Sequence, residues 1–249
     1  LSCSDYDILR PLLAGTVGVE GVDVEFFTEY AHSTRFEETV AGRLDVAEFT
    51  LGAYVAGWPD WAFTAIPAFP RRFFPHSSVF VNTRSGIRSL ADLAGKRVGV
   101  RRYANTVAIW LRGILTERHD VDGGGIDWYV TGPDRTPVEY GDNVHEVHGA
   151  DGPELLDRGT LDALVAMPQD TTLTDRDNVD ALFPDPRDVE RSYYEETGIY
   201  PLVNVMVVRD GLLEAEPDLP RRLLEAFRAS REAAAERELN GAKHPLVWW

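Results

Sequence analysis

The amino-acid sequence predicts an α/β protein built as two lobes with a ligand cleft between them. Short apolar runs alternate with helical signatures, which indicates mixed, mostly parallel sheets flanked by helices. The alternation is interrupted near residues 82–86 and 198–205, as expected if the chain crosses into a second lobe and returns. The 249 residues are enough for two cores. We therefore expect residues 1–83 and 205–249 to form a discontinuous first lobe and residues 84–204 to form the second.

The first lobe is expected to contain short strands, one early helix and one late helix. Ser33 can cap a helix that runs to Leu44, because apolar residues recur there at i, i+4 and i+8. The late helix spans residues 219–239 and carries an apolar stripe that includes Leu223 and Phe227. The strands expected in this lobe are 4–9, 22–27, 65–69, 78–82 and 203–208.

The second lobe shows the same alternation, with two helix starts marked by capping residues. Ser89 can cap a short helix at 90–93 whose third position is Asp92, which is the pattern of a capping box. Thr106 can cap a longer helix that ends near Arg118. The other elements expected are strands at 97–100, 126–130 and 161–166, a loop at 132–149 and a helix at 153–158.

Composition and charge exclude several classes of protein. The formal net charge of −16 argues against nucleic-acid binding, which needs clustered basic residues. No apolar run approaches the roughly 20 residues of a membrane span. Cys3 is the only cysteine, so no internal disulfide can form, and residues 1–10 do not resemble a signal peptide. We expect a cytoplasmic protein, or an exported one if a leader has been removed from a chain that does not start with Met.

Several ordered stretches resemble a known family. Residues 89–100 (SLADLAGKRVGV) resemble the entry to the second lobe of type 2 periplasmic binding proteins. More specific stretches, spread over nearly the whole chain, resemble the 4,5-dihydroxyphthalate decarboxylase family. They are 6–7 (YD), 12–15 (LLAG), 45–48 (DVAE), 69–72 (FPRR), 76–77 (HS), 81–82 (VN), 110–115 (WLRGIL), 182–185 (LFPD), 193–194 (YY) and 197–201 (TGIYP). The resemblance implies a two-lobed fold like that of the type 2 periplasmic binding proteins.

The sequence departs from the family pattern at three places. Asn204 stands where the family commonly has a histidine, and Pro75 stands where it often has an arginine. Family members also continue beyond the position of Trp249, so a C-terminal segment looks absent. Asn204 and Pro75 lie at expected cleft positions, and these departures bear on the reaction more than on the fold.

The resemblance implies a carboxy-lyase that converts a dihydroxylated aromatic dicarboxylate into a catechol monoacid. Each ring carbon that bears a carboxylate is para to a hydroxyl, so removing the hydroxyl proton moves electron density to that carbon. A general acid can then protonate the carbon while carbon dioxide leaves. This route needs a base, a proton donor and cations for the retained carboxylate, and no organic cofactor.

The match to the family suggests which residues carry this chemistry. Arg72 and Arg112 are candidates for the carboxylate clamp, with Arg71 in reserve, because the planar guanidinium binds a carboxylate through two hydrogen bonds. The alternative for each is a surface ion pair. His76 is the candidate for proton transfer, since histidine titrates near neutral pH, or else a structural histidine bonded to backbone. Glu48 can take the phenol proton, or can cap the following helix.

The loop before the Thr106 helix is a candidate ligand contact. Tyr103, Asn105 and Thr106 lie where amides at a helix start favour an anion, and Asn204 completes the expected substrate-binding residues. An ordinary capped helix would need Thr106 alone. His145 and His148 are not expected to hold a metal, because they lie in a loop and no cysteine or third histidine is near them in the sequence.

A different class of function remains open, since one fold supports many functions. The chain can be a non-catalytic solute-binding protein of a transporter that holds a small anionic aromatic ligand. A related enzyme acting on another aromatic acid is the third option. In each case the expected partner is a small anionic aromatic molecule, with no nucleic acid and no membrane insertion, and a homo-oligomer is left open.

Overall fold

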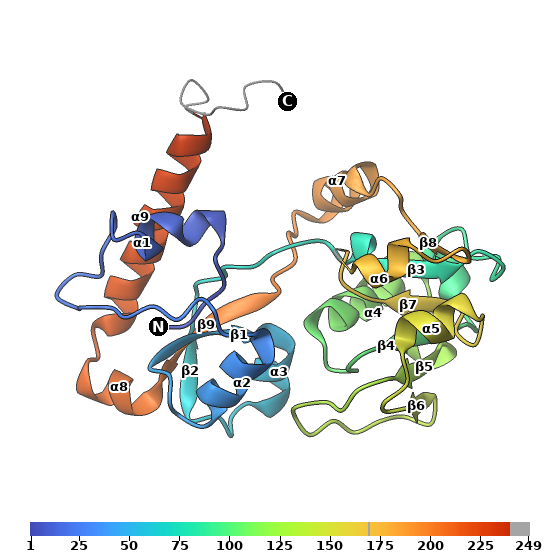
Figure 1. The fold of residues 1–249 in the computed structure, drawn as a ribbon, viewed down its shortest axis with the longest axis horizontal. Coiled ribbons are helices and arrows are strands. Elements are labelled where there is room, and N and C mark those ends of the chain that lie inside the picture. The colour runs from blue at the N-terminus through green and yellow to red at the C-terminus, as the bar shows by residue number, and fades with distance from the viewer. Residues whose placement is uncertain (169, 240–249) are drawn as a thin grey trace. The chain divides into compact units, whose positions relative to one another are not determined.

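The computed structural model describes residues 1–168 and 170–239, which form two compact units (Figure 1). Unit 1 contains residues 1–54, 58–72 and the described residues from Asn204 onward. Unit 2 contains residues 55–57 and 73–203.

The chain passes from unit 1 to unit 2 earlier than the sequence analysis placed the boundary. The change lies between Arg72 and Phe73 rather than after residue 83, because strand β3 (Val79–Asn82) pairs within the sheet of unit 2. The return lies between Val203 and Asn204. Residues 240–249 of the expected first lobe lie outside the described part of the chain.

Unit 1 is organised around a three-stranded sheet in the order β1 (Val46–Thr50), β9 (Asn204–Arg209) and β2 (Phe63–Ile66). The central strand β9 is antiparallel to both neighbours. Its side chains alternate between the two faces, so Val205 and Val207 join one core cluster and Met206 and Val208 join another. Outside the named strands, Ser2 bridges in parallel to Ala47 and Phe27.

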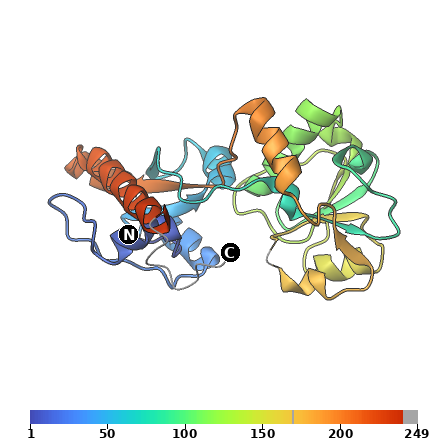
Figure 2. The ribbon, with the colours of Figure 1, turned by 90° about the horizontal axis from the view of Figure 1, so that it is seen from above.

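Helices contribute to the core on each face of this sheet. Residues of α2 (His32–Val40) and α3 (Leu51–Gly57) pack with Val205 and Val207. The other face packs against η1 (Asp7–Leu9), α1 (Arg10–Leu13) and α9 (Leu219–Leu239), while α8 (Asp210–Ala215) follows β9. Figures 1 and 2 agree that α9 runs beside the segment that contains η1 and α1.

A buried serine joins α9 to that first segment. The Ser230 hydroxyl donates to the carbonyl of Ile8 at 2.9 Å and accepts from the amide of Leu12 at 3.2 Å. The bounds of α9 agree with the prediction from its apolar stripe.

Unit 2 contains a six-stranded sheet in the order β6-β5-β4-β7-β3-β8. Strands β4, β5, β6 and β7 run parallel, and β3 is antiparallel to β7 and β8. The bounds are β4 (Arg97–Val100), β5 (Asp127–Val130), β6 (Val144–Glu146), β7 (Ala163–Val165) and β8 (Val179–Ala181).

Each sheet therefore has one named strand that runs antiparallel to its neighbours, β9 in unit 1 and β3 in unit 2. Strand β3 follows the change at 72/73, and β9 begins at the return at 203/204. The predicted α/β class with helix-flanked sheets is confirmed. Parallel pairing predominates in the sheet of unit 2, whereas both pairs of named strands in unit 1 are antiparallel.

The helix starts of unit 2 confirm one predicted cap and correct another. Ser89 and Asp92 form the capping box at η3 (Leu90–Leu93). Helix α4 (Thr106–His119) is capped by Asn105, whose side-chain oxygen accepts from the amide of Val107 at 2.9 Å, and not by Thr106. Thr106 is the first helical residue instead, and it is buried.

Several elements differ from the prediction. The expected strand at 4–9 is wrong, because the chain turns into η1 and α1 there, and residues 22–27 form only isolated bridges. The loop expected at 132–149 contains β6. The remaining elements are η2 (Pro75–Ser78), η4 (Gly123–Gly125), α5 (Gly152–Asp157), α6 (Thr171–Thr174) and α7 (Arg187–Thr197). Among the described residues, no helix combines the length and the apolar character needed to cross a membrane.

Candidate functional site

Unit 2 contains a pocket of about 570 Å³ at the carboxyl ends of its parallel strands. Val100 at the end of β4, Thr131 just after β5 and Val165 at the end of β7 line it. Open α/β sheets bind their ligands at this edge, and the volume lies within the roughly 300–1,000 Å³ range of small-molecule sites. Asn105 and Arg102 also line the pocket, and the predicted contact of Asn105 with a ligand stays a prediction.

The loop that carries these polar residues is held by a carboxylate that the sequence analysis missed. Asp134 accepts from the amide of Tyr103 at 3.0 Å, from the amide of Ala104 at 2.9 Å and from the Tyr140 hydroxyl at 2.7 Å. Two amides of the loop before α4, one of them from the predicted contact residue Tyr103, therefore already bind an internal anion. Asp134 stands alone in a loop rich in glycine and proline, so no local pattern marks it.

Positive charge gathers around the same loop. Burial lowers the pKa of Arg102, and the nearby positive charges of Arg135 and Arg101 lower it further. The Arg102 Nε donates to the carbonyl of Pro133 at 3.0 Å, which fixes the side chain at the pocket. Cations that repel one another are stabilised by an anion bound among them.

Arg112 and Tyr103 are brought together, but away from the lining of this pocket. The Arg112 Cζ lies 4.0 Å from the centre of the Tyr103 ring, a cation–π geometry, and its Nη2 donates to the Tyr103 carbonyl at 3.0 Å. Burial lowers the pKa of Arg112. Its Nη1 is buried without a hydrogen-bond partner among the described residues. The clamp role of Arg112 stays a prediction.

His76 lies in η2, enclosed by aromatic side chains of unit 2. Only 2% of the residue is exposed, and the ring centres of Tyr193, Phe183 and Phe74 lie 5.6, 6.0 and 6.4 Å from its own. Burial, and then the charge of His119, lower the pKa of His76 to about 4. The imidazole is therefore neutral at pH 7, and its role in proton transfer stays a prediction.

In unit 1, Glu48 forms the centre of a buried polar cluster. Its Oε1 accepts from the Tyr6 hydroxyl at 2.6 Å and from the Asn204 amide group. Its Oε2 accepts from the Ser4 amide at 2.8 Å and from the Arg35 Nη1 at 3.0 Å. A carboxylate offers about four acceptor positions, so this one is fully used.

The contacts of Glu48 set its protonation state. Burial alone would raise its pKa, but the hydrogen bonds from Tyr6 and Asn204 and the charge of Arg35 lower it overall. Glu48 does not cap the next helix, since Thr50 occupies the N-cap of α3. A proton from a substrate would have to displace one of the four donors, and the role of Glu48 as a base stays a prediction.

Arg35 is the cation of this cluster, and it is not among the site residues predicted from the sequence. Its side chain is 2% exposed, and it also donates from Nε to the Ser2 hydroxyl at 3.0 Å and from Nη1 to the Ser4 hydroxyl at 3.1 Å. In the sequence, Arg35 has the appearance of any arginine on a surface helix. Arg35 becomes distinct only in the folded protein, where β1 lies beside α2 and brings Glu48 against it.

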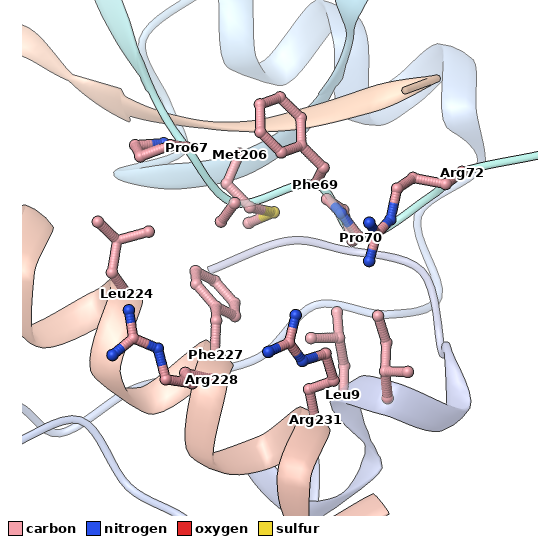
Figure 3. Close-up of a pocket in the computed structure, with 12 residues that line it drawn as sticks. Leu9, Pro67, Phe69, Pro70, Arg72, Met206, Leu224, Phe227, Arg228 and Arg231 are labelled. Atoms are coloured by element: carbon pink, nitrogen blue, oxygen red, sulfur yellow. The ribbon is translucent and has the colours of Figure 1, made fainter. Parts of the chain in front are cut away.

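Arg72 lines a different pocket, of about 440 Å³, within unit 1 (Figure 3). Its neighbours there come from the segment that follows β2, from η1 and from α9. Arg71 lies next to it, and its carbonyl accepts from the Asn204 amide at 3.2 Å.

The predicted site residues therefore fall into separate groups. Unit 1 joins Glu48 to Asn204, and unit 2 joins Tyr103 to Arg112. The two predicted clamp arginines, Arg72 and Arg112, belong to different units, as do Glu48 and His76.

No arrangement of metal ligands is found in the part of the chain that the structure describes. No group of three or more histidine, cysteine or acidic side chains occurs there with a geometry that could hold a metal ion. The histidines at 145 and 148 instead contact Asp127 and Glu146, at 3.6 and 3.1 Å.

Comparison with known proteins gives close relatives in one family. No protein-family model matches the chain. A 4,5-dihydroxyphthalate decarboxylase from Comamonas testosteroni is 33% identical over 252 residues, covering 95% of this chain and 76% of the relative. Another from Pseudomonas putida is 29% identical over 210 residues, covering 78% and 80%.

A solved structure supports the fold. The periplasmic aliphatic sulphonate binding protein SsuA from Escherichia coli has a TM-score of 0.51 and 15% identity, covering 95% of this chain and 72% of that one. The predicted fold, like that of the type 2 periplasmic binding proteins, is confirmed. With one-third identity spread over nearly its entire length, the chain belongs to the 4,5-dihydroxyphthalate decarboxylase family.

Proposed function

We propose that this protein is a carboxy-lyase that removes one carboxylate from 4,5-dihydroxyphthalate, or from a closely related dihydroxylated aromatic dicarboxylate. The observation that carries the proposal is the 33% identity to the Comamonas testosteroni decarboxylase over 95% of the chain. Such a substrate assigns the protein a role in the breakdown of phthalates, which we place in the cytoplasm as part of the proposal.

The reaction needs no external oxidant or reductant. A base removes the proton of one ring hydroxyl, and the electron density moves to the para carbon. That carbon takes a proton, the bond to its carboxylate breaks, and carbon dioxide leaves as the ring regains its aromaticity. The product is 3,4-dihydroxybenzoate. The protein must hold the retained carboxylate and supply one base and one acid.

The pocket of unit 2 is our candidate for the substrate site. Arg102 and Asn105 offer polar contacts, and Val100 and Val165 offer apolar ones. The lowered pKa of Arg102 reflects burial and the cations around it, and a bound carboxylate would relieve that repulsion.

The pKa values constrain the choice of acid. The proton delivered to the ring carbon must come from a group that carries one at neutral pH. His76, with a pKa of about 4, does not carry it in the free protein. If His76 is the acid, substrate binding must first raise its pKa, whereas the neutral imidazole can act as the base without such a change.

The direct test is incubation of the protein with 4,5-dihydroxyphthalate in deuterated water at neutral pH. We expect carbon dioxide and 3,4-dihydroxybenzoate with one deuterium on the carbon that lost the carboxylate. Arg102→Gln should raise KM, whereas Arg88→Gln, which removes an exposed arginine that does not line the pocket, should leave it unchanged. Failure of the wild-type protein to release carbon dioxide would refute the proposal.

The fold likeness to SsuA favours one alternative, a solute-binding protein without catalysis. Such a protein would bind the same anionic aromatic ligand, and Asn204 and Pro75, which depart from the family pattern, fit this alternative. Tight binding of 4,5-dihydroxyphthalate with no carbon dioxide released would favour it. An export signal encoded upstream of residue 1 in the gene would support it and would exclude a cytoplasmic enzyme.

A further inference from the structure

The pocket of unit 1 combines apolar walls with three arginines. Its lining includes Phe69 and Met206 on one side and Phe227 on α9. Arg72, Arg228 and Arg231 complete it, and no acidic side chain belongs to the lining among the described residues. The whole chain has 41 acidic residues and 25 basic ones, so a pocket bearing only positive charge runs against its composition.

The spacing along α9 places the charged and apolar residues on one face. Leu224, Phe227, Arg228 and Arg231 stand at i, i+3, i+4 and i+7, which brings them into one stripe. In Figure 3 the ring of Phe227 lies between the guanidinium groups of Arg228 and Arg231, and Arg72 reaches toward the same hollow from the segment after β2.

The arginines of α9 differ in their partners. Arg221 binds Asp218 and Glu225, and Arg222 binds Glu216. Within the described residues, by contrast, neither Arg228 nor Arg231 has an ion pair or a side-chain hydrogen bond. Two unneutralised cations that face the same hollow favour the binding of an anion there.

We propose that this pocket binds an aromatic carboxylate, with Arg228 and Arg231 holding the carboxylate and the apolar walls holding the ring. The planar guanidinium matches a carboxylate through two parallel hydrogen bonds, and the flat apolar side chains suit a ring. The pocket volume of about 440 Å³ accommodates a molecule of this size. The site is separate from the unit 2 pocket in its residues, and the proposal does not depend on the reaction proposed above.

The test uses phthalate, which has both carboxylates but lacks the hydroxyls that decarboxylation requires. Its binding to the full chain is measured by isothermal titration calorimetry, with succinate as a dianion that has no ring. In the double variant R228Q/R231Q we expect phthalate either to lose one bound molecule or to bind about 10-fold or more weakly. Succinate should bind the wild type more weakly than phthalate does.

The matched control is Arg237→Gln, which removes an exposed arginine of the same helix outside the pocket. It should bind phthalate as the wild type does, and melting curves should show that all variants stay folded. The proposal is wrong if the double variant keeps the wild-type isotherm, if the wild type does not bind phthalate, or if Arg237→Gln loses as much affinity.

Turnover of 4,5-dihydroxyphthalate, measured beside the titrations, separates the two proposals. If the wild type releases carbon dioxide while the double variant binds phthalate normally, the decarboxylase proposal stands and the unit 1 site is refuted. If no carbon dioxide appears but the double variant loses phthalate binding, the site stands and the decarboxylase proposal fails.

Discussion

Replacing Glu48 with glutamine should destabilise unit 1 strongly. The substitution keeps the size of the side chain but leaves the guanidinium of Arg35, 2% exposed, without its counter-ion. The new NH₂ group would also face two hydrogen-bond donors, whichever way it turns, because each oxygen of Glu48 now accepts two. Removing one member of a buried ion pair costs about 3–5 kcal/mol. For a chain of this length that corresponds to a fall of about 6–20 °C in the melting temperature.

The assay is thermal and urea unfolding at pH 7, followed by circular dichroism. The matched control is Glu38→Gln, which breaks the exposed pair between Glu38 and Arg43 and should leave the midpoint near that of the wild type. A Glu48→Gln protein that melts with the wild type would refute this reasoning.

The same variant tests the predicted catalytic role of Glu48. A carboxylate that acted only as a base would lose turnover on substitution and leave the melting temperature unchanged. The pH dependence of the stability provides a second test. Because the folded-state pKa of Glu48 is lowered, its contribution to stability is complete above its ordinary pKa. That contribution is lost as the pH falls through the folded-state value.

Three further predictions concern unit 2. The pKa of His76, about 4 against an ordinary 6.5, means that stability should fall by about 3 kcal/mol as the pH drops across that interval, and His76→Phe should remove this slope in urea unfolding. Gly99→Ala should cost about 1–3 kcal/mol, because the new Cβ would lie 2.5 and 2.8 Å from two leucine side chains, whereas Gly113→Ala, with open space around it, should stabilise α4 by up to about 1 kcal/mol. Asn105→Ala should cost about 1 kcal/mol in the same assay, and Asn105→Asp should recover most of it. A wild-type His76 resonance that titrates near 6.5, or unchanged unfolding in either of the other cases, would contradict the corresponding prediction.

The elements that the sequence predicted well are those whose cause is local. The apolar stripe of α9 and the capping box at Ser89 each depend on residues a few positions apart, and both are confirmed. The cap of α4 was misplaced by one position because asparagine and threonine are both good caps and stand side by side. The strand expected at 4–9 is wrong. The alternating pattern of these residues is typical of a strand, but the chain begins a helix here, and Pro11 stands in the first turn of α1, where proline is favoured.

The features that the sequence could not predict depend on contacts between distant residues. Strand β3 lies in unit 2 because it pairs with β7, more than eighty residues further along the chain. Asp134 and Arg35 likewise acquire their roles only when another segment arrives beside them. The sequence could have indicated Arg228 and Arg231, since their spacing places them on one face of α9. In the sequence, however, they look the same as the ion-paired Arg221 and Arg222 of the preceding turns.

Asn204 shows how a departure from the family pattern can keep a contact and remove a charge. Its amide group donates to Glu48, and it begins β9 opposite Thr50 of β1. The imidazole that the family commonly has at this position can donate in the same way, but it titrates, and a neighbouring carboxylate would raise its pKa. An amide donates at every pH. In this chain Asn204 therefore donates to Glu48 without the change of charge that a histidine would undergo. If the reaction needs proton transfer at this position, another group must perform it.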